Sequence, residues 1–344
     1  MTKIVIWAQS VCRSTMDLYR EVKRLRDDVG VTVVLRRDGR GEDVRKLREA
    51  QGQGDYSDVV DRVWDGKFES GVELLDLGAV HVFSGYQVNR AVRELMVEAK
   101  RRALRVVEYD EAPCEMCVGM KGALKRLYYA MVLPMRVRRA VEAADLFISA
   151  SGNMGMDRLV RLGWKREAIV PFGYASGKLG ELGSGKWEVG SGLRVLHTGV
   201  EAKYRGVDVL KRAAASLKRR GVELEVKFTG GKVDAAQLPG LYEWADVVVA
   251  CGLCEPWGMR VNDVLLEGIP VVVSDGMGAA MLCDEFGCGC VVPKGDANAL
   301  AAVLERCAND RGFLAHLRSG AKMAAAEIAP EKRAKVWLGK VLGE

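Results

Sequence analysis

Short apolar runs alternate with longer amphipathic segments from one end of the chain to the other. We predict strands at residues 4–8, 31–35, 80–83, 105–109, 146–149, 169–171, 194–198, 224–229, 247–250, 270–274 and 290–292. Helices are predicted at residues 16–25, 87–103, 121–143, 156–162, 207–219, 257–266, 298–309, 312–328 and 330–343. This alternation is typical of parallel sheets with helices on both faces. The sequence therefore predicts an α/β protein with doubly wound parallel sheets.

One stretch interrupts the alternation and predicts a domain boundary. From Tyr174 to Gly192 the chain reads YASGKLGELGSGKWEVGSG, with six glycines, three serines and no apolar period, which is linker composition. A chain of 344 residues has room for about two domains of ~150 residues. We expect Rossmann-like domains at residues 1–173 and 193–328, a linker at 174–192, and a C-terminal helix at 329–344 that crosses back to the first domain. Ligands of two such domains bind in a central cleft at the carboxyl ends of the strands.

Composition and missing motifs argue against several classes of protein. No apolar run approaches the ~18 residues of a spanning helix, and the N-terminus lacks a signal-peptide pattern, so we expect a cytoplasmic protein. A net charge of +6 falls short of a dedicated nucleic-acid binder. Nine cysteines in such a chain are expected to be thiols. The turn after residues 4–8 has no glycine, and no P-loop occurs, which argues against a dinucleotide-dependent dehydrogenase and a nucleotide triphosphatase.

The segment EPWGMRVNDVLLEG carries the densest chemical signal. Glu255 follows the strand at residues 247–250 and is therefore expected at the strand's carboxyl end. Gly258 and the amides of residues 257–260 begin a helix, whose N-terminus suits a phosphate or pyrophosphate. Asp263, eight residues after Glu255, can accept hydrogen bonds from vicinal hydroxyls. The pattern predicts a site for a polyhydroxylated phosphate ester. The alternative is that Glu255 caps the helix and Asp263 pairs with Arg260.

Four motifs in order resemble a known family. They are Ile169 to Gly173 (IVPFG), Tyr204 to Leu210 (YRGVDVL), Leu241 to Asp246 (LYEWAD), and Glu255 to Val272 with its EPWGM, Asp263 and GIPVV. Together they are similar to the V-P-N-G, K-G-V-D-x-L, L-Y-x-x-A-D and E-x7-E segments of the retaining GT-B glycosyltransferases of family 4 (group 1). The resemblance spans residues 169–304, whereas the N-terminal half agrees only in its alternation.

The resemblance implies a nucleotide-sugar donor held mainly by the second domain, and an acceptor on the side of the first. Glu255 would bind hydroxyls of the donor sugar and Asp263 the ribose, while amides after Gly258 would contact the diphosphate and Arg205 would neutralise it. The implied donor-binding residues are Gly199, Lys203, Arg205, Gly230, Glu255, Trp257, Gly258, Met259, Arg260 and Asp263. The implied catalytic residues are Glu255, Arg205 and Asp110.

In such enzymes the leaving phosphate itself helps to deprotonate the acceptor on the same face of the sugar, so the resemblance implies no protein nucleophile, metal or other cofactor. Three departures bear on this. The second acid is Asp263 where the family usually has Glu, Val200 stands where it usually has Arg, and the loop from Gln9 to Ser14 lacks its glycine pair. Lys203 could supply the charge that Val200 lacks.

Glu108, Asp110 and Glu111 form an acidic cluster at the end of the strand at residues 105–109. The resemblance implies that Asp110 or Glu111 orients the acceptor, and the alternative is solvated loop acids. A metal-binding D-x-D of the other major glycosyltransferase fold is disfavoured, because that fold has a single nucleotide-binding domain. His81, His197 and His316 are expected to be structural.

Two cysteine pairs have zinc-like spacing, Cys114 with Cys117 and Cys251 with Cys254. They fall in different predicted domains, so we expect coincidence rather than a zinc site. Cys283, Cys288 and Cys290 are expected to be small core residues.

The segment from Met120 to Arg139 holds six basic residues and no acid, interleaved with leucine, methionine and tyrosine. Such a helix can lie on the inner face of an anionic membrane and present the site to a lipid-linked acceptor. The alternative is a helix packed on the sheet with a solvated basic face.

These features together predict a retaining, metal-independent glycosyltransferase that moves a hexose from a nucleoside-diphosphate sugar to a hydroxyl acceptor on a glycan or glycolipid. The alternative is an inactive nucleotide-sugar-binding or scaffold protein of the same fold, which Asp263 and Val200 could signal. A sugar-nucleotide 2-epimerase is disfavoured, because the additional acids and histidines expected of its crevice are missing.

Overall fold

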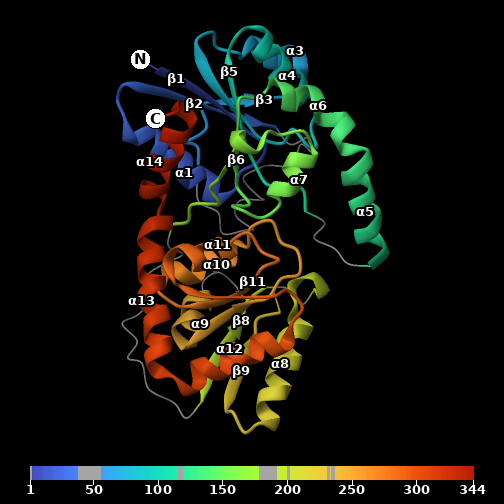
Figure 1. The fold of residues 1–344 in the computed structure, drawn as a ribbon. Coiled ribbons are helices and arrows are strands. Elements are labelled where there is room, and N and C mark those ends of the chain that lie inside the picture. Colours follow the sequence, from blue (N-terminus) through green and yellow to red (C-terminus); the bar gives the residue numbers. More distant parts are fainter. Residues whose placement is uncertain are drawn as a thin grey trace. The chain divides into compact units, whose positions relative to one another are not determined.

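The structure, a computed structural model, describes residues 2–37, 56–114, 119–177, 192–199, 202–230, 233 and 237–344. The described chain divides into two compact units. Unit 1 holds residues 1–113, 124–175 and 330–344, and unit 2 holds residues 114–123 and 176–329. Most of the predicted linker, residues 178–191, lies outside the described residues. The two units are described separately below, and Figure 1 gives their elements.

Unit 1 contains a parallel sheet of seven strands in the order β3-β2-β1-β4-β5-β6-β7. The strands are β1 (Thr2–Ala8), β2 (Val29–Arg36), β3 (Arg62–Trp64), β4 (Ala79–Phe83), β5 (Arg105–Asp110), β6 (Leu146–Ser149) and β7 (Ile169–Pro171). The helices are α1 (Arg13–Leu25), α3 (Phe68–Glu73), α4 (Arg90–Arg101), α5 (Gly119–Met131, of which residues 124–131 belong to unit 1), α6 (Leu133–Ala143), α7 (Met156–Arg161) and α14 (Pro330–Leu342), with a 3-10 turn, η1, at Arg166–Ala168. Strand order reverses between β1 and β4, whose carboxyl ends form the switch point of this sheet.

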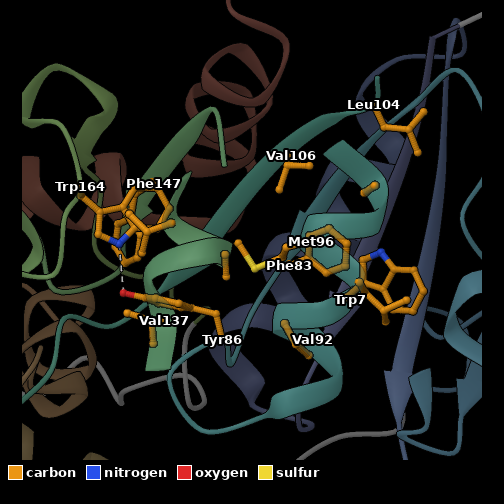
Figure 2. Packing of buried hydrophobic residues seen from close by; sticks show 14 of the residues in the cluster. Trp7, Phe83, Tyr86, Val92, Met96, Leu104, Val106, Val137, Phe147 and Trp164 are labelled. Carbon is orange, nitrogen blue, oxygen red and sulfur yellow. Dashed lines mark hydrogen bonds between the residues drawn. The ribbon is translucent and has the colours of Figure 1, made fainter. Parts of the chain in front are cut away.

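Aromatic side chains fill the core on one face of this sheet, as Figure 2 shows. Trp7 stacks on Phe83, with ring centroids 5.4 Å apart. Trp164 donates its indole N–H to the hydroxyl of Tyr86 over 3.1 Å, so the buried polar ends of both rings are satisfied. On the other face α14 packs beside α1, and Trp337 lies 5.9 Å from the ring of Tyr19. The last helix of the chain is thus part of the core of unit 1.

Unit 2 contains a parallel sheet of five strands in the order β12-β11-β10-β8-β9. The strands are β8 (Leu193–His197), β9 (Leu224–Phe228), β10 (Val247–Ala250), β11 (Val271–Ser274) and β12 (Gly289–Val292). The helices are α8 (Val207–Arg219), α9 (Leu238–Trp244), α10 (Met259–Leu266), α11 (Ala280–Phe286), α12 (Ala297–Asn309) and α13 (Arg311–Ile328), with a 3-10 turn, η2, at Lys203–Arg205. Here the strand order reverses between β8 and β10.

The α/β class and both parallel sheets confirm the fold predicted from the alternation. Several predicted helices have other bounds in the structure, and two of these differences have a clear local cause. The single helix expected at residues 121–143 is two helices separated at Val132, because Pro134 lacks an amide hydrogen and occupies the first turn of α6. The helix expected from Trp257 begins instead at Met259, because Gly258 adopts a left-handed φ of 102°. Of the helices that the structure describes, none is long and apolar enough to cross a bilayer.

Candidate functional site: the carboxyl ends of β8 and β10

The switch point of unit 2 gathers the strongest candidate residues. Arg205 ends the 3-10 turn after β8, and Glu255 follows β10, the neighbouring strand. The loops after these two strands leave the sheet in opposite directions, because the strand order reverses between them. Fifty residues of sequence separate the two side chains, yet Arg205 Nη1 donates to Glu255 Oε1 over 2.5 Å.

The Arg205–Glu255 pair is largely buried and only partly satisfied. The Glu255 side chain is 9% exposed and that of Arg205 is 23% exposed. Within the described part of the chain, Arg205 Nε and Glu255 Oε2 are buried without a hydrogen-bond partner. Burial raises the pKa of Glu255, and Arg205 opposes that rise. A buried donor and a buried acceptor without partners cost free energy unless a ligand satisfies them.

Backbone hydrogen bonds hold the two loops together. Glu255 N donates to Gly276 O over 2.9 Å, and Glu255 pairs with Met277 in a short parallel bridge. Leu253 N donates to Tyr204 O over 2.7 Å, which joins the loop after β10 to the turn that carries Arg205. Both charged side chains therefore sit on backbone that is fixed by hydrogen bonds, which favours preorganisation of a site.

Gly206 allows the turn that carries Arg205 to pack against β10. Its φ is 71°, and a Cβ built there would lie 1.9 Å from Cys251 O.

We expect Gly206→Ala to lower the free energy of unfolding by at least about 3 kcal/mol, because a left-handed φ and a backbone clash act together. Chemical denaturation measures the loss. Gly221→Ala is the matched control, since Gly221 has a φ of 75° with no atom within 4 Å of the built Cβ, and it should cost only about 1 kcal/mol. Equal losses in both variants would contradict the close packing.

The first turn of α10 offers amides to an anion. Gly258 caps the helix without a side-chain hydrogen bond. The amides of Met259 and Arg260 have no backbone acceptor among the described residues. These two N–H groups are among those that the sequence predicts as contacts for an anion. Trp257 differs from the others, because its side chain is buried and its indole donates to Asn262 Oδ1 over 2.8 Å.

Asp263 lies on the second turn of α10, beside a residue that the sequence prediction did not single out. The pKa of Tyr242 is raised to about 12, first by burial and then by Asp263, while Arg260 opposes the rise. These three side chains are therefore neighbours. Asp263 is half-buried, which suits a carboxylate that accepts from hydroxyl groups of a ligand.

The remaining predicted donor residues have different surroundings. Gly199 follows β8 with a φ of 111°, and its amide donates to Thr229 Oγ1 over 2.9 Å. Gly230 has a φ of 60°, and no neighbouring atom of the described residues lies within 4 Å of a Cβ built at Gly199 or at Gly230. Lys203 is exposed. Val200 lies outside the described residues.

In unit 1 the predicted residue Asp110 lies at the carboxyl end of β5. Its carboxylate accepts from the amides of Gly85 and Glu111, over 3.1 and 2.7 Å. The pKa of Asp110 is raised to about 6, because burial outweighs these two hydrogen bonds. Glu111 accepts from the hydroxyl of Tyr174 over 3.1 Å. Asp110 and the Arg205–Glu255 pair belong to different units.

Glu108, two residues earlier, is fully buried. Its pKa is raised well above the usual value by burial and then by Asp110. Tyr86 N donates to its Oε1 over 3.4 Å, while Oε2 has no partner in the described part of the chain. The sequence does offer one indication of this residue: Glu108 lies within a strand, between Val107 and Tyr109, where a buried position usually takes an apolar side chain.

The titration of Asp110 predicts a pH dependence of stability. Its pKa of about 6 exceeds the ordinary value of 3.8 for an aspartate, so the folded state binds more protons than the unfolded state between these two pH values. Its contribution therefore falls by about 3 kcal/mol as pH rises from below 4 to above 6. We expect Asp110→Asn to remove this dependence. Denaturation of both proteins at pH 4 and pH 7 tests it, and parallel changes in the two would contradict a raised pKa.

Histidines and cysteines add no metal site within the described residues, where no group of three or more His, Cys, Asp or Glu can hold an ion. His81 lies in the core, where it accepts from the indole of Trp7 over 3.2 Å. Cys114 Sγ and Cys254 Sγ, both in unit 2, approach to 2.7 Å, so two of the four paired cysteines do meet. Cys251 instead donates to Gly206 O, and Cys117 lies outside the described residues.

The chain has two parallel sheets, of seven and five strands, whose strands alternate with helices. This is the GT-B fold of glycosyltransferases. Residues 193–310, most of unit 2, match the family model described as Glycosyl transferases group 1. The family resemblance drawn from the motifs is therefore confirmed for this part of the chain. No curated protein matches the sequence significantly.

Solved structures share the fold over the whole chain. HepE of Anabaena in complex with UDP has a TM-score of 0.68 at 16% identity, covering 100% of both chains. HepE is also known in complex with UDP-glucose, with a TM-score of 0.64. A glycosyltransferase from Rickettsia africae has a TM-score of 0.67 at 12% identity, covering 99% of this chain and 98% of that one. Sucrose-phosphate synthase from Thermosynechococcus elongatus has a TM-score of 0.61 at 14% identity, covering 100% of this chain and 98% of that one.

Proposed function

We propose that this protein is a glycosyltransferase that moves a hexose from a nucleoside-diphosphate sugar to a hydroxyl acceptor. The observation that carries the proposal is the buried Arg205–Glu255 pair, in which Arg205 Nε and Glu255 Oε2 are left for a ligand beside the first turn of α10. This site falls within the segment that matches the glycosyltransferase family model. The complexes of HepE with UDP and UDP-glucose make UDP-glucose the first donor to test.

The proposed chemistry follows from the charges at the site. Departure of a nucleoside diphosphate leaves negative charge on its terminal phosphate, and preorganised cations and amides stabilise that charge. Arg205 would supply the cation, and the amides of Met259 and Arg260 would supply the N–H groups. Glu255 Oε2 would accept from a hydroxyl of the sugar, and Asp263 would accept from the ribose. Lys203, Gly199 and Gly230 would border the donor.

The proposed reaction retains the configuration of the sugar and uses no metal. The leaving phosphate would take the acceptor proton on the same face of the sugar, so no protein nucleophile is needed. In unit 1, Asp110 or Glu111 would orient the acceptor hydroxyl. The acceptor would be a glycan or a lipid-linked glycan, reached through peripheral contact of the segment from Met120 to Arg139 with an anionic membrane surface.

Incubation with radiolabelled UDP-glucose, with and without EDTA, tests the proposed activity. Release or transfer of labelled sugar that EDTA leaves unchanged is the expected result, and NMR of the product gives its anomeric configuration. GDP- and ADP-glucose belong in the same experiment, because the sequence does not specify the base. Donor binding without turnover across these donors and a panel of glycan and glycolipid acceptors would instead identify an inactive scaffold. A ligand at 100 times its Kd adds about 2.7 kcal/mol of stability, so a thermal-shift measurement detects such binding.

A further inference from the structure

Unit 1 has a groove between α4 and α6 that the proposed donor chemistry does not use. It encloses a volume of about 640 Å³. Its lining residues come from α3, α4 and α6, and those that matter here are Arg90, Arg93, Glu94, Glu98, Arg136 and Arg139. Four arginines and two glutamates thus line the same groove. Their pairing decides what the groove can bind.

Arg93 is a buried cation without a carboxylate partner. It is only 9% exposed, and its Nη1 donates to the carbonyl of Tyr86 over 2.8 Å. No ion pair joins Arg93 to an acid within the described residues. Burial lowers the pKa of Arg93, and the nearby Arg136 lowers it further, while Tyr128 and Glu94 oppose the fall. A buried guanidinium beside a second one is costly in free energy unless an anion accompanies them.

The two acids that line the groove are already paired. Glu94 accepts from Arg90 over 2.7 Å, and Glu98 accepts from two arginines on its own helix, Arg101 and Arg102.

Arg136 and Arg139, on α6, make no ion pair within the described part of the chain. Arg136 donates to the hydroxyl of Tyr128 over 2.9 Å, and Arg139 has neither an ion pair nor a hydrogen bond. Arg93, Arg136 and Arg139 therefore line one groove without an ion pair to any described acid, and we call them the arginine cluster. Guanidinium groups bind phosphate oxygens through paired hydrogen bonds.

Apolar side chains extend from the groove along α5. Leu124, Leu127 and Met131 are 62%, 55% and 62% exposed, and their spacing of three and four residues places them on one side of α5. Met135, on α6, is 75% exposed. Met135 also lines the groove. We call these four residues the apolar stripe. From Leu124 to Arg139 the chain has no acid.

We propose that the arginine cluster binds the phosphate of an anionic phospholipid, while the apolar stripe inserts into the surface of the bilayer. The apolar stripe favours a phospholipid over a soluble phosphate ester as the ligand. A soluble ester would leave four large apolar side chains exposed to water, whereas a lipid surface covers them. This inference rests on the membrane contact in the proposed function, and it adds the residues that would bind the lipid headgroup. Vesicle binding needs no sugar transfer, so its failure is distinguishable from failure of the enzymatic activity.

Sedimentation of the full chain with vesicles at physiological salt tests the proposal. Vesicles of phosphatidylcholine with 30 mol% phosphatidylglycerol should bind the protein, and phosphatidylcholine alone should not.

The variant Arg136→Ala/Arg139→Ala should partition about thirtyfold more weakly, since each basic residue near an anionic surface contributes about 1 kcal/mol. Leu127→Asn/Met131→Asn should weaken partition at least about tenfold. Lys218→Ala/Arg219→Ala, which removes two exposed cations from α8, should change it less than about twofold.

Three results would overturn the proposal. The first is equal binding to both kinds of vesicle. The second is an equal loss in the α8 control, which would mean diffuse attraction without a headgroup site. The third is a thermal shift with 10 mM inorganic phosphate, abolished by Arg136→Ala/Arg139→Ala, in a protein that binds no vesicle, because the ligand would then be a soluble phosphate. All variants replace exposed side chains, and circular dichroism verifies that they remain folded.

Discussion

Replacement of Arg205 by alanine should lower kcat for sugar transfer by about 10² to 10³, which is the usual cost of removing one preorganised group that stabilises a leaving charge. Arg205 Nη1 donates to Glu255 Oε1, and Arg205 Nε remains buried without a partner in the described structure. The donor should also bind more weakly. Initial rates over a range of donor concentrations separate the effects on kcat and KM.

Two control variants make the Arg205 result specific. Arg205→Lys keeps the positive charge but loses the planar guanidinium and, with it, the Nε–H group that is left for the ligand. This variant should therefore recover only part of kcat. Arg212→Ala removes an exposed arginine from α8, the next helix, and should leave kcat within about twofold. Full activity in Arg205→Ala would show that Arg205 does not neutralise the leaving group. A proportional loss of folded protein in the same variant would show that its role is structural.

Substitution of Glu255 by glutamine should remove the preference of the site for a nucleotide sugar over the free nucleotide. Glu255 Oε2 is buried without a partner in the described part of the chain, and we assign it to a hydroxyl of the sugar. Hydrogen bonds to a charged group contribute about 1.5 to 3 kcal/mol, so the ratio of the Kd of UDP to that of UDP-glucose should fall about tenfold or more. Calorimetric titration with both ligands measures the ratio, and kcat should fall about a hundredfold.

Glu285→Gln is the matched control for Glu255→Gln, because Glu285 is an exposed glutamate on α11 in the same unit. It should leave both Kd values unchanged. If Glu255→Gln weakened UDP and UDP-glucose equally, Glu255 would act on the nucleotide or on the loop and not on the sugar. If it changed neither, the proposed role of Glu255 would be wrong.

Elements with a strong period could be predicted closely from the sequence. The strand at Val247–Ala250 and the helix at Val207–Arg219 have the predicted bounds, because a run of valines and a full amphipathic period each favour one structure. The short elements β3, α3, α9 and α11 were not predicted, since three to seven residues carry too little periodicity. The break at Val132 was missed because the basic and apolar period continues across Pro134.

The candidate site was less accessible to prediction than the fold. Motifs indicated Arg205 and Glu255 separately, but their ion pair depends on β8 and β10 being neighbours, which only the strand order reveals. Tyr242 and Asp263 come from α9 and α10, before and after β10, and only the packing of the folded chain brings them together. The raised pKa of Asp110 depends on burial beside Gly85, which no local pattern encodes. Tertiary neighbours thus determine the electrostatics of residues that the sequence could identify only by type.

A crystal structure of the full chain with the nucleoside diphosphate that gives the largest thermal shift tests the central claim most directly. The account predicts the diphosphate within hydrogen-bond distance of the amides of Met259 and Arg260 and of the Arg205 guanidinium, with the ribose at Asp263. A nucleotide bound away from the carboxyl ends of β8 and β10, or a site empty at saturating concentration, would contradict it.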